Sequence, residues 1–156
     1  MKRRIRVAAL LLNELSEILL VQHVHPITNF EWWVPPGGGM ESIDESIFSC
    51  AMRETFEETG LHIKCDGYIE YIGEFFDIEN DQLNIELFVS AKVEGSKLTT
   101  SNIHGKGADE HYIKDANWFS REMMQGIVIF PEVLKNEFWD DMRDKGTKTT
   151  KYLGRQ

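Results

Sequence analysis

Runs of apolar residues, some continuous and some alternating with polar residues, predict several strands along the chain. Residues 4–12 and 17–24 are rich in leucine and β-branched residues and flank the polar stretch "NELS", which predicts a buried hairpin at the start of the chain. Residues 68–78 and 83–95 alternate around "ENDQ" and predict a second strand pair. Residues 112–120 predict a further short strand.

The segment between the two strand pairs predicts a loop that leads into a helix. Residues 27–44 hold two prolines and three glycines without periodicity, which is typical of a loop. A helix is expected from about Asp44 to Thr59, with Ser42 or Asp44 as its N-cap and Gly60 as the left-handed residue that ends it. Further helices are expected over residues 120–126 and 131–145, the second with Pro131 in its first turn.

Length and composition indicate one domain in which helices and strands are mixed. The 156 residues are 42% hydrophobic and 28% charged, close to the averages of soluble globular chains. We therefore expect an α+β fold, with a single domain over residues 1–143 and a flexible C-terminal tail over residues 144–156. No apolar run reaches the ~20 residues of a membrane span, and neither a signal peptide nor cysteine metal spacing is recognised, so a cytoplasmic protein is expected.

The charge balance restricts the partners. The net charge is −9, from 26 acidic and 17 basic residues, and duplex nucleic acid is not expected as a partner because phosphate contacts need a basic face. An anionic small molecule would require a bound cation. A homodimer is compatible with this composition, which does not determine the oligomeric state.

The predicted helix carries three carboxylates near its C-terminal end. Glu54, Glu57 and Glu58 are neighbours on a helix surface, and Glu54 and Glu58 interrupt the stripe of apolar residues that contains Cys50 and Ala51. Anions in the last turn are disfavoured by the helix dipole by roughly 0.3–1 kcal/mol each. A solvated acidic face is one interpretation. A hard divalent cation, Mg²⁺ or Mn²⁺, is the other, since it would make these charges favourable.

The same residues match a known signature. Residues 39–61 read as a glycine, five residues, a glutamate, seven residues and then "RETFEETGL". This pattern resembles the Nudix box of the Nudix hydrolases at every charged and glycine position. The matching residues are Gly39, Glu45, Arg53, Glu54, Glu57, Glu58 and Gly60. Thr55 departs from the aliphatic residue that is usual there, and the glycine loop is one residue longer than its common form, so that Gly38 or Gly39 could carry the metal-facing carbonyl.

The resemblance implies an α/β/α sandwich around a mixed β-sheet and the hydrolysis of a pyrophosphate bond in a nucleoside diphosphate linked to another group. It implies metal ligation by Glu54, Glu57, Glu58 and the carbonyl of Gly39, with Mg²⁺ or Mn²⁺ as the cofactor. Glu57 or Glu58 would then act as the general base, and Arg53 would orient a carboxylate. Glu45 and Gly60 would be mainly structural.

Residues outside the box are weaker candidates. The same resemblance implies an additional catalytic carboxylate from a later loop, for which Glu110 is the candidate, with Glu74 and Glu86 as alternatives and His111 as its neighbour. Trp33, Phe75 and Trp118 are candidates for stacking on a nucleotide base.

Two other functions remain open from the sequence. One is a catalytically silent nucleotide-binding module of the same fold, although the box is intact. The other is an isoprenoid-diphosphate isomerase, which would need a reactive cysteine; Cys50 lies on the inward helix face, where packing is the simpler interpretation.

Overall fold

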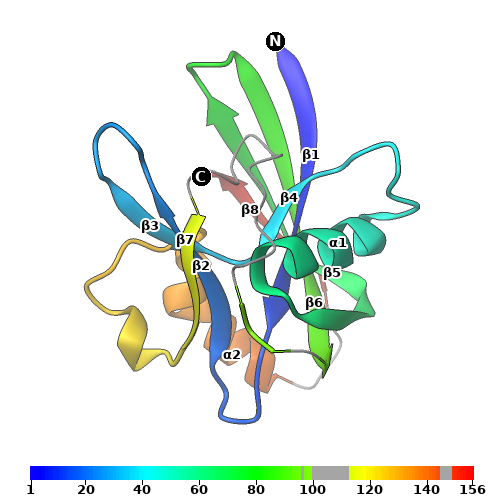
Figure 1. The fold of residues 1–156 in the computed structure, drawn as a ribbon, viewed down its shortest axis with the longest axis vertical. Helices are drawn as coiled ribbons and strands as arrows, with labels where there is room; N and C mark the ends of the chain where they lie inside the picture. Colours follow the sequence, from blue (N-terminus) through cyan, green and yellow to red (C-terminus); the bar gives the residue numbers. More distant parts are fainter. Residues whose placement is uncertain (96, 100–112, 145–148) are drawn as a thin grey trace.

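The fold is built on two β-sheets with helices on both sides (Figure 1). The structure is a computed structural model, which describes residues 1–95, 97–99, 113–144 and 149–156. The larger sheet has five strands in the order β4-β1-β6-β5-β8, and the smaller has three in the order β3-β2-β7. Strands β1 and β6 are parallel, as are β5 and β8, whereas β1 and β4 and also β5 and β6 are antiparallel. The expected mixed α+β architecture is confirmed.

The larger sheet contains the second predicted strand pair. Strands β5 and β6 pair along most of their length, as the alternation of residues 68–78 and 83–95 predicts. The five strands are β4 (Gly37–Gly39), β1 (Lys2–Leu11), β6 (Gln82–Gly95), β5 (His62–Asp77) and β8 (Lys151–Arg155).

The predicted hairpin at the start of the chain is only partly confirmed: the chain turns at residues 13–17, but β1 and β2 belong to different sheets. Strand β2 (Ile18–Val24) pairs with β3 (Glu31–Val34) and β7 (Ile113–Phe119) in the smaller sheet, and a bridge between Leu12 and Ile18 is its link to the end of β1. Strand β2 and the second half of β1 are apolar on both faces, so each is buried best between non-local neighbours. The predicted strand over residues 112–120 is confirmed as β7.

The predicted loop over residues 27–44 is also partly wrong, because it contains β3 and β4. The three glycines of β4 pair with β1 in the register Arg6 with Gly39 and Ala8 with Gly37. A Cβ atom at Gly37 would lie 2.4 Å from the carbonyl oxygen of Val7. Glycine therefore allows this segment to lie against β1 as an edge strand, where other residues would clash.

Helix α1 runs from Ile47 to Thr59 and begins later than expected. Its N-cap is Ser46, which forms a capping box with Ser49, and neither Ser42 nor Asp44 caps it. The Asp44 carboxylate instead accepts hydrogen bonds from Arg53. Gly60 ends the helix in the left-handed conformation with φ of 73°, which confirms its predicted role.

The C-terminal region differs most from expectation. The segment over residues 120–126 forms only a 3-10 turn at Glu122–Met124. The single helix expected over residues 131–145 is a 3-10 turn at Glu132–Lys135 followed by α2 (Glu137–Arg143), because Asn136 has non-helical dihedral angles. The end of the chain is not frayed: β8 pairs with β5, and the Thr150 hydroxyl donates to the Ile69 carbonyl at 2.6 Å.

Apolar clusters on the two faces of the larger sheet hold the layers together. Helix α1 packs through Cys50 and Ala51 onto Val7, Ala9 and Val89, all buried. On the opposite face, α2 packs through Phe138, and this cluster includes Leu10, Ile18, Leu20, Tyr71, Phe88, Phe119 and Leu134. Within the described ranges no helix is both long and apolar enough to cross a bilayer.

Thr55 provides a test of the core. Its side-chain oxygen is buried without a hydrogen-bond partner in the described part of the chain. We expect Thr55→Val to raise the free energy of unfolding by about 1 kcal/mol, because an unsatisfied polar group is replaced by one of the same shape. Thr59→Val is the matched control. The Thr59 hydroxyl donates to the Thr55 carbonyl at 2.6 Å, so its loss should destabilise the fold in urea unfolding. Equal effects of the two variants would contradict this account.

Candidate active site

The glycine strand and the acidic helix are in direct contact. A Cβ atom at Gly38 would lie 2.4 Å from the carboxyl carbon of Glu54, so the absence of a side chain at Gly38 makes room for that carboxylate. The Gly37 backbone N–H donates to Glu58 Oε1 at 2.9 Å. Strand β4 thereby positions two of the three predicted carboxylates.

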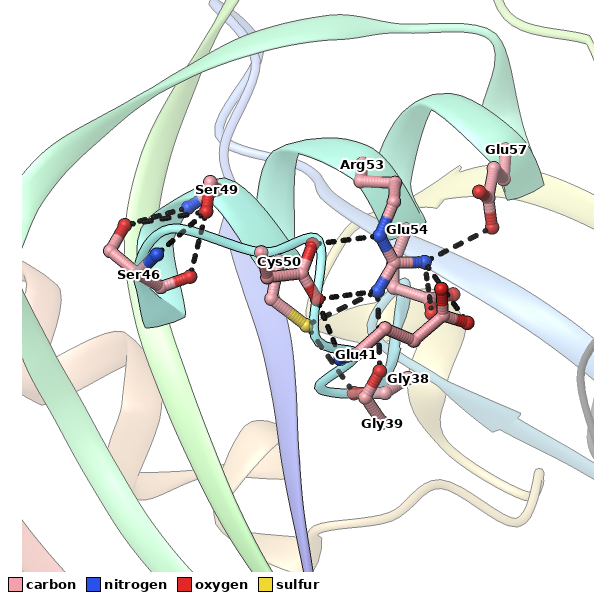
Figure 2. A network of polar contacts seen from close by, with 10 residues as sticks. Gly38, Gly39, Glu41, Ser46, Ser49, Cys50, Arg53, Glu54 and Glu57 are labelled. Carbon is pink, nitrogen blue, oxygen red and sulfur yellow. Dashed lines mark hydrogen bonds and ion pairs between the residues drawn. The ribbon is translucent and has the colours of Figure 1, made fainter.

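Arg53 lies at the centre of the polar network on this side of α1 (Figure 2). Its guanidinium donates to Glu54 Oε1 at 2.8 Å and to Glu57 Oε2 at 3.4 Å. It also donates twice to Asp44, at 2.8 Å each. Hydrogen bonding to Asp44 raises the pKa of Arg53, and the guanidinium in turn holds the pKa of Asp44 at about 2. Arg53 is therefore a permanent cation that orients neighbouring carboxylates.

The three predicted carboxylates differ in burial. Glu54 is 7% exposed and Glu58 is 2% exposed, whereas the Glu57 side chain is 35% exposed. Burial raises the pKa of Glu54, and hydrogen bonding to Arg53 opposes this shift without cancelling it. A desolvated carboxylate of this kind gains from a further cation. The expectation that Glu54 and Glu58 interrupt the inward stripe of α1 is confirmed by their burial beside Cys50 and Ala51.

The donor set fits a hard divalent cation. Carboxylate and carbonyl oxygens are the ligands that Mg²⁺ prefers, and β4 and α1 supply both kinds. Within the described ranges, the side chains do not form a converged cluster of three metal-ligating groups, and Arg53 bonds to both Glu54 and Glu57. The Gly39 carbonyl accepts from Arg53 at 3.2 Å, and the Gly38 carbonyl lies 3.8 Å from Cys50 Sγ. Each carbonyl oxygen has two lone pairs, so a hydrogen bond leaves one for a metal.

The aromatic candidates lie in different surroundings. Trp33 packs edge to face on Phe119 at 4.7 Å, in the cluster under α2. Trp118 packs against the cluster under α1. Phe75, on β5, is 46% exposed and is the one of the three with an open face. Surface stacking by Trp33 and Trp118 thus gains no support from their packing.

Of the candidate acids outside the box, the structure describes Glu74 and Glu86. Glu74 accepts a hydrogen bond from the Tyr152 hydroxyl at 2.8 Å, and Glu86 forms an ion pair with Arg6 at 3.2 Å. Glu110 and His111 lie outside the described residues. Both alternatives to Glu110 are therefore already engaged by other side chains.

Sequence reasoning missed the acid that pairs with Arg53. The signature spacing assigns the structural acid to Glu45, but Glu45 is exposed and Asp44 holds Arg53. Asp44 directly precedes Glu45, so an acid one position away from the signature was the available signal in the sequence. The basic residues Arg4 and Arg6, which the sequence did not single out, are only half-exposed.

Asp44 should also contribute to the acid sensitivity of the fold. Its pKa is lowered from 3.8 to about 2, so its stabilising effect is fully present above pH 4 and is lost as the pH falls toward 2. After allowance for solvent screening, about 1 kcal/mol is expected from this group. The free energies of unfolding of the protein and of Asp44→Asn should differ by a constant amount above pH 5, and this difference should shrink as the pH falls from 4 through 2. A difference at pH 2 as large as that at pH 5 would contradict this assignment.

The fold and the glycine-and-carboxylate arrangement define the class of α+β hydrolases that act on phosphate anhydrides. Residues 2–137 match the NUDIX domain family, and the chain therefore belongs to the Nudix hydrolases, which act on the pyrophosphate bonds of phosphorus-containing anhydrides. The resemblance seen in residues 39–61 is thereby confirmed.

The chain is also similar to individual known proteins. The chain is 39% identical over 61 residues to an m7GpppN-mRNA hydrolase, NUDT17, of Danio rerio; the match covers 38% of this chain and 20% of that protein. The fold is similar to a MutT protein from Methanosarcina mazei, with 26% identity, a TM-score of 0.67 and coverage of 92% and 97%. It is also similar to an ADP-ribose pyrophosphatase from Streptococcus suis, with 17% identity, a TM-score of 0.65 and coverage of 96% and 98%.

Proposed function

We propose that the protein hydrolyses a pyrophosphate bond in a nucleoside triphosphate or in a nucleoside diphosphate linked to another group, with Mg²⁺ or Mn²⁺ as its cofactor. The observation that carries the proposal is the pair of buried carboxylates, Glu54 and Glu58, held against a glycine strand in the second half of α1. Two buried anions, one of them in the last turn of the helix, are costly unless cations join them.

Each residue of the site has a proposed role. Glu54, Glu57, Glu58 and the Gly39 carbonyl hold the metal, which supplies charge neutralisation on the phosphate oxygens and makes water more acidic. Glu57 or Glu58 accepts the proton of the attacking water, and Glu57 is the more accessible of the two. Arg53 fixes the directions of Glu54 and Glu57. Glu110 remains the proposed additional carboxylate.

Two relatives support the substrate class by their names. One is named an m7GpppN-mRNA hydrolase and the other an ADP-ribose pyrophosphatase. Both names describe a nucleoside whose phosphates are linked to a second group. The chain spans a fifth of the length of NUDT17, so the choice of leaving group is for experiment to decide.

A substrate panel tests the proposal. The protein is incubated with Mg²⁺ or Mn²⁺ and with nucleoside triphosphates, ADP-ribose, nucleotide sugars, dinucleoside polyphosphates and a capped RNA fragment, and the products are identified by chromatography. We expect metal-dependent cleavage between two phosphorus atoms in at least one substrate. Tight binding without cleavage across the panel would favour the silent nucleotide-binding module instead.

The isomerase alternative is disfavoured by the environment of Cys50. Its side chain is buried, and burial raises the pKa of its thiol to about 12. A thiol held neutral and inaccessible cannot act as a nucleophile or acid toward an isoprenoid diphosphate. Both cysteines are free, which accords with the cytoplasmic location that we propose, and a homodimer remains a further prediction.

A further inference from the structure

Two arginines lie on the face of the larger sheet opposite α1. Arg4 and Arg6 alternate with Ile5 along β1 and share a face with Leu10, which packs in the cluster under α2. Toward the N-terminal end of β1 this face opens to solvent, and arginines replace the apolar residues. The same face continues across the sheet, where Arg4 is in register with Asn84 and Asn84 with Phe75.

Arg4 is held against the glycine strand. A Cβ atom at Gly39 would lie 2.2 Å from Arg4 Nε and 2.4 Å from Nη2, so the guanidinium group lies across a position that only glycine leaves open. Arg6, its neighbour on the same face, forms an ion pair with Glu86 at 3.2 Å. Arg4 forms no ion pair or side-chain hydrogen bond with any residue that the structure describes. It is a half-buried cation whose donors are available to a ligand.

The position of Arg4 relates it to the carboxylate site. Gly38 contacts the Glu54 carboxylate and Gly39 contacts the Arg4 guanidinium, and consecutive α-carbons are about 3.8 Å apart. Neighbouring side chains of a strand point to opposite faces, so the carboxylate and the guanidinium flank β4 from its two sides. Strand β4 is the edge of its sheet and consists of glycines, so a ligand that crosses this edge meets no side chain of β4 itself.

We propose that Arg4 binds a phosphate group of the substrate, on the side of β4 opposite the carboxylates. This inference rests on the proposed function for its choice of a phosphate anhydride as ligand. The planar guanidinium carries a fork of donors that matches two phosphate oxygens. In a chain of net charge −9, such a cation offsets the repulsion between an anionic substrate and the acidic helix. Arg4, Asn84 and Phe75 are paired across three neighbouring strands and lie on the same face of the sheet. The exposed Phe75, the candidate for stacking on a base, is therefore on the same face as Arg4.

Binding of product-like anions tests the inference without turnover. Inorganic pyrophosphate and the four common nucleoside diphosphates are titrated in Mg²⁺ by calorimetry. We expect Arg4→Gln to weaken the binding of pyrophosphate roughly tenfold or more, and Arg4→Lys to retain part of it because the charge remains while the fork is lost. Arg3→Gln is the matched control: it removes the same charge from the next residue of β1, which is exposed and points to the other face. Its affinity should change less than about twofold.

The outcomes separate this inference from the proposed function. Equal affinities of Arg4→Gln and Arg3→Gln, or a wild-type protein that binds neither pyrophosphate nor any of the diphosphates, would overturn the role of Arg4. Where the panel yields a substrate, Arg4→Gln should raise KM with little effect on kcat, and an unchanged KM would overturn the role of Arg4 while leaving hydrolysis intact. Selective loss of pyrophosphate binding in Arg4→Gln, in a protein that cleaves nothing, would support Arg4 and count against the hydrolase.

Discussion

Glu57→Gln should reduce kcat on the substrate identified in the panel by at least about a hundredfold, while the protein stays folded. Glutamine keeps the size of the side chain but removes the negative charge and the basic oxygen that the proposed mechanism requires. The free energy of unfolding should change by less than about 1 kcal/mol, because the partly exposed ion pair with Arg53 at 3.4 Å and the unfavourable helix dipole oppose each other.

Glu41→Gln is the matched control for this experiment. Its side chain is 62% exposed and lies 3.9 Å from the same nitrogen of Arg53, so it removes a nearby acid that has no proposed role in catalysis. We expect its kcat to stay within about threefold of wild type. If Glu57→Gln retained wild-type kcat at saturating Mg²⁺, neither the base nor the ligand role of Glu57 would hold. If the two variants lost activity equally, a general charge effect would be the explanation.

Asp44→Asn should destabilise the protein by about 1 kcal/mol at neutral pH, whereas Glu45→Gln should be close to neutral. Asp44 accepts two hydrogen bonds from Arg53 at 2.8 Å and its side chain is 2% exposed, so asparagine leaves Arg53 without its fully buried acid. Glu45 is exposed. We expect Asp44→Asn to lower kcat as well as stability, because Arg53 orients Glu54 and Glu57 only while Asp44 holds it in place.

Urea unfolding of these two variants measures the difference directly. A larger loss of stability in Glu45→Gln than in Asp44→Asn would mean that Glu45, the acid at the signature spacing, and not Asp44, pairs with Arg53. Kinetics on the two variants give an independent readout: KM and kcat of Glu45→Gln should match those of wild type, while kcat of Asp44→Asn should fall.

Features encoded within a few residues could be predicted well. The acidic helix was recognised from its apolar stripe and from Gly60, since helix periodicity and a left-handed C-cap both lie within one short segment. The pair β5 and β6 followed from alternation around a turn. The Nudix box was recognised for the same reason, because its charged residues lie on consecutive turns of one helix and their spacing alone places them together.

Features that depend on distant partners could not be predicted. The sequence alone does not specify that β1 and β2 separate into different sheets or that residues 151–155 pair with β5, because those partners lie far away along the chain. The location of Arg4 over Gly39 could not be predicted either, because it depends on the register between β1 and β4. The sequence by itself thus determined the family and the acidic helix. Only the tertiary structure decided which acid anchors Arg53, how Trp33 and Trp118 pack against the core and which arginine lies over Gly39, because hydrophobic burial and strand register are set by contacts between residues far apart in the chain.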